Sequence, residues 1–267
     1  MNAKLLFSII LFSFFSFDVF PIFPEIRTAP APLFRDPIFD GAADPTVVYN
    51  RKEKKWYMFY TNRRANVSCE GTSWVYGTHI GVASTSDHGK TWDYSGKLDL
   101  EFETGHNTFW APNVIYENGR YHLFVTYIQG IHNTWSGRGR IAHYVSTNLW
   151  KWKFKGLLNL SEHALLDPTV FKKPNNTWGI WYKDGVLGAT VTAVSKNLDK
   201  FKPVQGTVIN DCGHEAPLVF KYKDYYWLMT DQWNGLGVYR SDDTEKWKKK
   251  GVILGNPGTR KEDGVRA

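Results

Sequence analysis

The sequence predicts an all-β propeller built from four-stranded antiparallel blades. Three observations support this prediction: a strand-rich unit recurs four times, each unit opens on a proline-headed apolar strand, and no helical periodicity competes after the N-terminal segment. Units made of three strands, a turn and an outer strand are typical of propeller blades, which are arranged around a central axis. With 267 residues, the chain can form one large all-β domain.

The first element along the chain is an apolar segment from Leu5 to Phe17. Its length suits the core of a signal peptide and is short for a membrane span. Residues 1–25 are therefore predicted to be a signal peptide, with cleavage anywhere between about Phe20 and Ala31. The mature chain is expected to be secreted, extracellular or periplasmic, without stable membrane insertion. Retention of the segment as an uncleaved anchor is the alternative.

The predicted propeller domain covers residues 31–267, and the head of each unit is a residue before proline. The heads predict blades that start near residues 44, 111, 167 and 216. The four dipeptides are Asp44-Pro45, Ala111-Pro112, Asp167-Pro168 and Ala216-Pro217. Proline is tolerated as the first residue of an inner strand, where its nitrogen needs no partner. The inner strands should therefore gather their first residues around one axis.

The second strand of each unit is a nearly continuous aromatic run, as expected for strands that are covered on both faces. These runs are Lys55–Tyr60, Arg120–Val125, Thr177–Tyr182 and Tyr225–Met229. The third strands end at Ser84, Ser146, Ser195 and Ser241, and the aromatic residues Trp92, Trp152, Phe201 and Trp247 follow them. The segment Thr85–Trp92 resembles the Asp-box turn of sialidases and other propellers, which is a structural turn.

Composition narrows the function. The 16% aromatic residues and 22% charged residues indicate a packed globular protein. The net charge of +7 permits acidic partners, but the only dense cationic stretch is Lys246–Lys250, so no nucleic-acid partner is expected. Cys69 and Cys212 could pair in an exported protein or remain buried thiols. The histidines show no zinc-site spacing, and no metal ligands are predicted.

Three of the four units carry an acid at the head: Asp44 and Asp167 directly precede the head proline, and Glu215 directly precedes the head residue Ala216. Cleavage of a glycosidic bond needs one carboxylic acid to protonate the leaving oxygen and a second carboxylate to activate water or attack directly. A third carboxylate can tune the pKa of the acid through repulsion. Asp-Pro is also a frequent turn dipeptide, so one such acid indicates little. Three acids in register across the repeats predict a catalytic set.

These motifs resemble glycoside hydrolase family 43, the five-bladed propeller glycosidases that include arabinofuranosidases and β-xylosidases. The matching pieces are Ala43-Asp44-Pro45, Trp110-Ala111-Pro112, Leu166-Asp167-Pro168-Thr169-Val170 and His214-Glu215-Ala216-Pro217. The resemblance implies that Asp44 is the general base, that Asp167 raises the pKa of the acid and orients it, and that Glu215 is the general acid. It also implies inversion at the anomeric carbon.

The chain departs from this family after the fourth unit, which ends near Lys250. A partial fifth blade is expected from residue 251, and we interpret the chain as C-terminally truncated, so that the activity of this chain alone stays open. A closing strand from Leu33 to Phe39 is the alternative. The family often has a fifth-blade histidine associated with a central metal ion, and no matching residue exists here. A structural calcium ion is therefore left open.

Further site residues are expected at strand ends and beside the heads. The predicted substrate-binding residues are Asn62, Arg63, Trp110, Trp135, Trp181, His214 and Trp233. Trp110 would provide an aromatic platform for a sugar ring. Weaker strand-end candidates are Arg64, Lys183, Asp231 and Gln232. The competing interpretation of each residue is an ordinary loop or core position, and for His214 a hydrogen-bonded structural histidine.

The predicted function is that of an inverting glycoside hydrolase in carbohydrate metabolism, which degrades polysaccharide or oligosaccharide. The chemistry requires no cofactor, the partner is the carbohydrate substrate, and the oligomeric state is left open. Two alternatives remain: a non-catalytic carbohydrate-binding propeller and a retaining fructan-type propeller glycosidase. The chain lacks the Asn-Asp-Pro-Asn opening and the Glu-Cys acid motif of the fructan enzymes. A sialidase is disfavoured because no arginine set falls at the unit heads.

Overall fold

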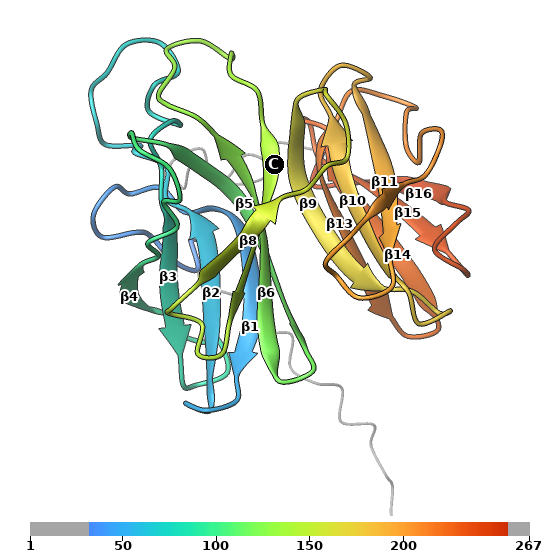
Figure 1. Ribbon diagram of the computed structural model, residues 1–267, viewed down its shortest axis with the longest axis horizontal. Coiled ribbons are helices and arrows are strands. Elements are labelled where there is room, and N and C mark those ends of the chain that lie inside the picture. The colour runs from blue at the N-terminus through green and yellow to red at the C-terminus, as the bar shows by residue number, and fades with distance from the viewer. Residues whose placement is uncertain (1–31, 256–267) are drawn as a thin grey trace, which may run out of the picture.

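The protein is an all-β propeller in the computed structural model, which describes residues 32–255 (Figure 1). The described chain forms sixteen strands in four separate four-stranded antiparallel sheets. No residue in this range is helical, and none of its elements is a helix long and apolar enough to cross a membrane. The predicted signal peptide lies outside the described residues. The all-β propeller prediction is confirmed, and the fifth blade remains a prediction.

Each blade is one sheet whose strands follow one another in chain order. Blade 1 consists of β1 (Ala43–Asn50), β2 (Lys55–Thr61), β3 (Ile80–Thr85) and β4 (Asp93–Lys97). Blade 2 consists of β5 (Thr108–Glu117), β6 (Arg120–Ile128), β7 (Arg140–Ser146) and β8 (Lys153–Leu157). Blade 3 consists of β9 (Leu165–Lys172), β10 (Trp178–Asp184), β11 (Ala189–Ser195) and β12 (Lys202–Pro203). Blade 4 consists of β13 (Glu215–Tyr222), β14 (Tyr225–Asp231), β15 (Leu236–Ser241) and β16 (Lys248–Ile253).

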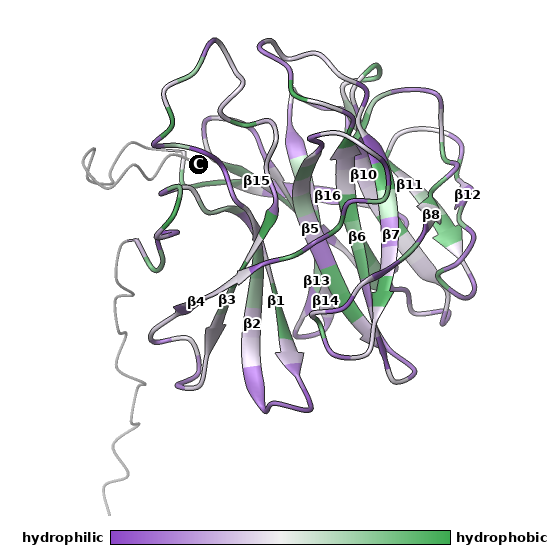
Figure 2. Ribbon diagram, turned by 60° about the vertical axis from the view of Figure 1, so that its left-hand side comes forward, coloured by the Kyte–Doolittle hydropathy of each residue, from purple (hydrophilic) through white to green (hydrophobic). Residues whose placement is uncertain are grey.

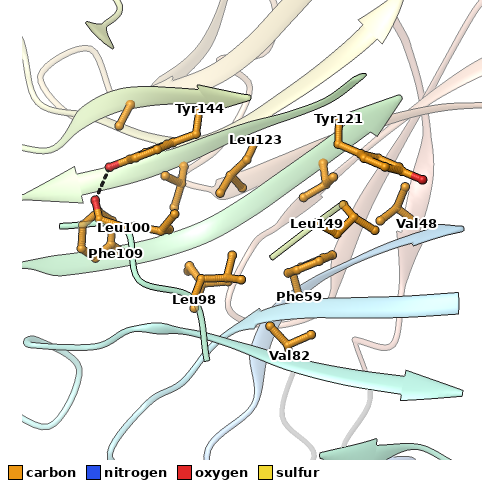
Figure 3. Packing of buried hydrophobic residues seen from close by; sticks show 14 of the residues in the cluster. Val48, Phe59, Val82, Leu98, Leu100, Phe109, Tyr121, Leu123, Tyr144 and Leu149 are labelled. Atoms are coloured by element: carbon orange, nitrogen blue, oxygen red, sulfur yellow. Dashed lines mark hydrogen bonds between the residues drawn. The ribbon is translucent and has the colours of Figure 1, made fainter. Parts of the chain in front are cut away.

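The blades pack face to face through three apolar cores. Between blades 1 and 2, Phe59 and Val82 meet Leu123 and Tyr144, as Figure 3 shows. The equivalent cores between blades 2 and 3 and between blades 3 and 4 use both faces of β6 and β10. This explains why the second strands are continuous aromatic runs. Figure 2 shows the apolar residues along strands such as β6, whereas the β1–β2 turn is hydrophilic.

One face of blade 4 is not covered by any part of residues 32–255. Burial alternates along β14 and β15, and Leu218 on the inner strand is 48% exposed. Blade 1 differs because the segment before it covers its outer face: Phe34 packs against Tyr60 at a ring distance of 5.4 Å. This segment forms no strand between Leu33 and Phe39, so the alternative of a closing strand there is wrong, whereas the favoured interpretation of a truncated chain stays a prediction. Residues 251–253, where a partial fifth blade was expected, belong to β16 of blade 4.

All four inner strands are irregular where proline follows the head residue. The strand pairing shifts register at each head, and each residue before proline has a positive φ: 51° at Asp44, 48° at Ala111, 56° at Asp167 and 50° at Ala216. Left-handed backbone is uncommon for residues with a side chain and often marks functional sites. The bulge at each head turns the chain where the blades converge.

The turn after each third strand is a repeated hydrogen-bonded motif. In blade 2, Ser146 Oγ accepts the backbone N–H groups of Asn148 and Leu149, and the same arrangement recurs at Ser195 and Ser241. In blade 1, Thr85, which follows Ser84, takes this position. Such side-chain turns satisfy backbone donors locally. The predicted turn at Thr85–Trp92 is therefore structural.

Cys69 and Cys212 are both free thiols.

A buried histidine pair in blade 2 should make stability depend on pH. His143 is 2% exposed, and its Nε2 lies 3.0 Å from Nδ1 of His122. Burial, followed by the neighbouring His122 and Lys155, lowers the pKa of His143 to about 3, whereas an unperturbed histidine has 6.5. Between these two pKa values, His143 is protonated in the unfolded chain and neutral in the folded chain. The free energy of unfolding therefore decreases as pH falls from about 6.5 towards about 3.

Because of this pair, we expect the free energy of unfolding to fall by on the order of a few kcal/mol across that pH range. Urea unfolding measured at a series of pH values tests the expectation. His143→Phe, which suits the ring of Phe124 that stacks on His143 at 4.4 Å, should flatten the pH dependence. The carboxylates titrate in the same way in both proteins. An identical pH dependence of the free energy of unfolding would therefore contradict the role given to His143.

Candidate active site

The three predicted acids line one cavity. Asp44, Asp167 and Glu215 come from the heads of blades 1, 3 and 4 and border a space of about 610 Å³. The other residues of its wall are Arg63, Val75, Trp110, Trp135, Leu166, Ala216, Asp231 and Trp233. An adjoining cavity of about 320 Å³ is lined by the head prolines of all four blades. The blade heads therefore converge as the repeat predicted.

Asp44 is held from two sides. Thr61, the last residue of β2, donates from Oγ1 to Asp44 Oδ2 at 2.8 Å. The same hydroxyl accepts the backbone N–H of Ala111 at 2.8 Å, so it connects the heads of blades 1 and 2. The guanidinium of Arg63 lies 3.6 Å from Asp44 Oδ2. Asp44 is thus a fixed carboxylate at the wall of the cavity.

Asp167 connects blade 2 to blade 4. Its backbone N–H donates to Thr126 Oγ1 at 2.9 Å, and its Oδ2 accepts the N–H of Ala216 at 3.0 Å. Burial, followed by the negative charges of Asp44 and Glu215, raises the pKa of Asp167 to about 7, against the opposing effects of the Ala216 N–H and Lys183. Asp167 therefore fixes the backbone directly beside Glu215, and its raised pKa leaves it about half protonated near neutral pH.

Glu215 begins β13 and pairs across the sheet with Asp231. Burial raises the pKa of Glu215, and Asp231 and Asp44 raise it further. Lys183 opposes this rise because its Nζ lies 3.8 Å from Glu215 Oε2. A raised pKa keeps a carboxyl group available as a proton donor at higher pH, which is the requirement for a general acid.

Aromatic side chains form the rest of the wall. Trp110 is fixed because its Nε1 donates to the carbonyl oxygen of Val75 at 2.6 Å. Trp135 is 74% exposed and stands edge-on to Trp110 with ring centroids 6.5 Å apart. Trp233 is 53% exposed, and Lys183 lies over its ring at 5.1 Å. Exposed indole rings beside a polar cavity suit the apolar faces of sugar rings.

Three of the predicted substrate-binding residues do not line the cavity. Trp181 is 1% exposed and packs in the core between blades 3 and 4, against Trp247. His214 is fully buried, with Nε2 at 2.8 Å from Thr190 Oγ1 and Nδ1 at 2.8 Å from the carbonyl oxygen of Cys212. Asn62 is 2% exposed. The structure gives these side chains a structural position, whereas Arg63, Trp110, Trp135 and Trp233 border the cavity.

Sequence reasoning missed Thr61 and Thr126, which hold the heads of neighbouring blades. Their signal was present: both lie at or near the end of the second strand of their blade, at the register position that Lys183 and Asp231 take in blades 3 and 4. Within residues 32–255, no group of three or more His, Cys, Asp or Glu side chains is arranged to hold a metal ion. The arrangement places a carboxyl group that can donate a proton, Glu215, and a second carboxyl group, Asp44, on the wall of the same cavity.

Solved structures of glycoside hydrolases share this fold. A family 43 β-1,3-galactosidase with galactodeoxynojirimycin has a TM-score of 0.64 at 16% identity, over 84% of this chain and 81% of its own. A family 43 enzyme from Xanthomonas citri, complexed with xylotriose, has 0.65 at 14% identity, over 84% and 76%. A family 117 glycoside hydrolase from the marine bacterium Zobellia galactanivorans has 0.60 at 17% identity, over 79% and 68%. No family model and no curated protein matches the sequence.

Proposed function

We propose that this protein is a secreted glycoside hydrolase that cleaves glycosidic bonds in polysaccharide or oligosaccharide by an inverting general acid/base mechanism. The observation that carries the proposal is the convergence of Asp44, Asp167 and Glu215, from three blades, on one cavity with an aromatic wall. The similarity to family 43 and family 117 structures supports it at the level of the fold.

In this proposal, Glu215 protonates the glycosidic oxygen as the bond to the anomeric carbon breaks. Asp44 removes a proton from a water molecule that attacks the anomeric carbon from the opposite face of the ring. Asp167 orients Glu215 through its hydrogen bond to the neighbouring Ala216 N–H and, in its ionised form, would raise the pKa of the acid by repulsion. Trp110 and the exposed Trp135 and Trp233 would hold the sugar between these groups.

The first experiment is a screen of nitrophenyl arabinofuranosides, xylosides and galactosides, followed by oligosaccharides of the sugar that is cleaved. Release of nitrophenol, with loss of release in Asp44→Asn, is the expected result, and on the oligosaccharides both Asp44→Asn and Glu215→Gln should lose hydrolysis. Proton NMR of the first product then gives the anomer: inversion supports the mechanism proposed here, and retention would place the chain with the fructan-type chemistry.

A non-catalytic carbohydrate-binding propeller is the second candidate, because Trp135 and Trp233 expose large aromatic surfaces beside the cavity. Isothermal titration with the same oligosaccharides separates the two. Binding without any product release, in a folded protein with all three acids intact, would favour this candidate over hydrolysis.

A further inference from the structure

One register position at or near the end of the second strand lies opposite the residue that precedes the blade head. By strand register, Thr61, Thr126, Lys183 and Asp231 hold equivalent positions in blades 1 to 4. In blades 1 and 2, the threonine Oγ1 accepts the backbone N–H of the next blade head, at Ala111 and at Asp167. The position is therefore one that organises the neighbouring head.

Blade 3 breaks this pattern with Lys183. A lysine ammonium group has no acceptor, so it cannot receive the N–H of the next head, Ala216. Asp167 Oδ2 accepts that N–H instead. The side chain of Lys183, which is 13% exposed, is free to reach Glu215 Oε2 at 3.8 Å, while its Nζ lies 5.1 Å from the ring centre of Trp233.

We propose that Lys183 is a positioning residue for Glu215: its ammonium group holds the Glu215 carboxyl group beside Trp233, in the orientation that faces the cavity. The proposal rests on the role of Glu215 in the proposed function and assigns a further residue to it. The position of the ammonium group is restricted because Lys183 is largely buried and contacts both a Glu215 carboxyl oxygen and the face of the Trp233 ring.

The charges around Glu215 explain why a cation is needed there. Asp44 from β1 and Asp231 from β14 both repel the ionised form of Glu215, and the charge of Glu215 in turn raises the pKa of Asp167 from β9. Lys183 from β10 acts in the opposite direction on both Asp167 and Glu215. Without it, Glu215 would retain its proton to higher pH and would lose the partner that fixes its orientation.

The test is a titration of Glu215 in the full chain, followed by carbon-13 NMR of labelled glutamate carboxyl groups and assigned with Glu215→Gln. Lys183→Met should raise the titration midpoint of Glu215 by about one pH unit or more, since an opposite charge at this range shifts a carboxyl pKa by roughly 1–3 units. Lys183→Arg should restore most of the original midpoint. An unchanged midpoint in Lys183→Met would overturn the proposal.

Lys172 provides a matched control in the same blade. Its Nζ lies 3.0 Å from Glu117 Oε1 and 5.3 Å from the ring centre of Trp178, so it makes the same two kinds of contact away from the cavity. Lys172→Met should leave the Glu215 midpoint unchanged. If Lys183→Met does not fold, as judged by circular dichroism, Lys183→Gln takes its place with the same expected direction.

Activity gives an independent readout. The basic limb of the kcat/KM profile reports the group that must be protonated, so Lys183→Met should move that limb to higher pH and lower kcat with little change in KM. A shifted midpoint with no hydrolysis by any variant would support the Lys183–Glu215 contact and reject the proposed function. Hydrolysis with an unmoved limb and midpoint would reject the role of Lys183 alone.

Discussion

Replacement of Glu215 by Gln is expected to lower kcat/KM on a sugar with a poor leaving group by about 10²–10⁴-fold, because general acid catalysis contributes that much. The change keeps the size and shape of the side chain and removes only the proton that is donated. Since Glu215 is half-buried beside Lys183 and Asp231, the fold should be preserved. Steady-state kinetics on an unactivated oligosaccharide measures the effect.

The choice of leaving group separates the roles of the two carboxylates. A dinitrophenyl glycoside departs without protonation, so Glu215→Gln should retain much more activity on it than on the oligosaccharide. Asp44→Asn should lose activity on both substrates, because water must be activated in either case. Near-normal turnover of the oligosaccharide by Glu215→Gln or by Asp44→Asn would reject the assignment of that residue.

Phe59→Ala is expected to destabilise the folded protein by about 3–5 kcal/mol, the usual cost of removing a fully buried ring from a core. Phe59 has no exposed surface and lies between blades 1 and 2 (Figure 3). The rings of Tyr57 and Trp152 each lie 6.3 Å from the Phe59 ring. The cavity that it leaves is bordered by strands of two sheets, which cannot close it without moving a blade. Urea denaturation gives the free energy of unfolding.

Val47 is the matched control for this substitution. It lies on β1 of the same blade but is 48% exposed, so Val47→Ala should change the free energy of unfolding by no more than about 0.5 kcal/mol. A comparable loss in both variants would mean that the blade 1–blade 2 core does not control stability.

The repeat made the fold predictable, and the same repeat misled the assignment of some site residues. Proline-headed units located the four inner strands to within a few residues of Ala43, Thr108, Leu165 and Glu215. Because blades converge, the three acids followed from the repeat alone. The buried position of Trp181 could not be predicted in this way. Its strand is covered on both faces, so the sequence pattern is the same whether an aromatic residue near the cavity end faces the core or the substrate.

Local backbone preference does not predict the backbone conformation of the residues before the head prolines. A residue before proline usually favours extended backbone. Ala216, and the equivalent residue of every other blade, is instead left-handed. Contacts between blades, such as the hydrogen bond from the Ala216 N–H to Asp167, support this conformation. Such contacts join residues that are distant in sequence, and a reading of local patterns cannot supply them.

The uncovered face of blade 4 makes the described propeller comparable to a linear array with a free end. Blades 2 and 3 are each stabilised by two neighbours, whereas blade 4 is stabilised through the one core that it shares with blade 3. In such arrays the terminal unit opens most readily, because it has only one interface to lose. Blade 4 carries Glu215, so the population of molecules with a correctly placed acid would follow the local opening equilibrium of this one sheet.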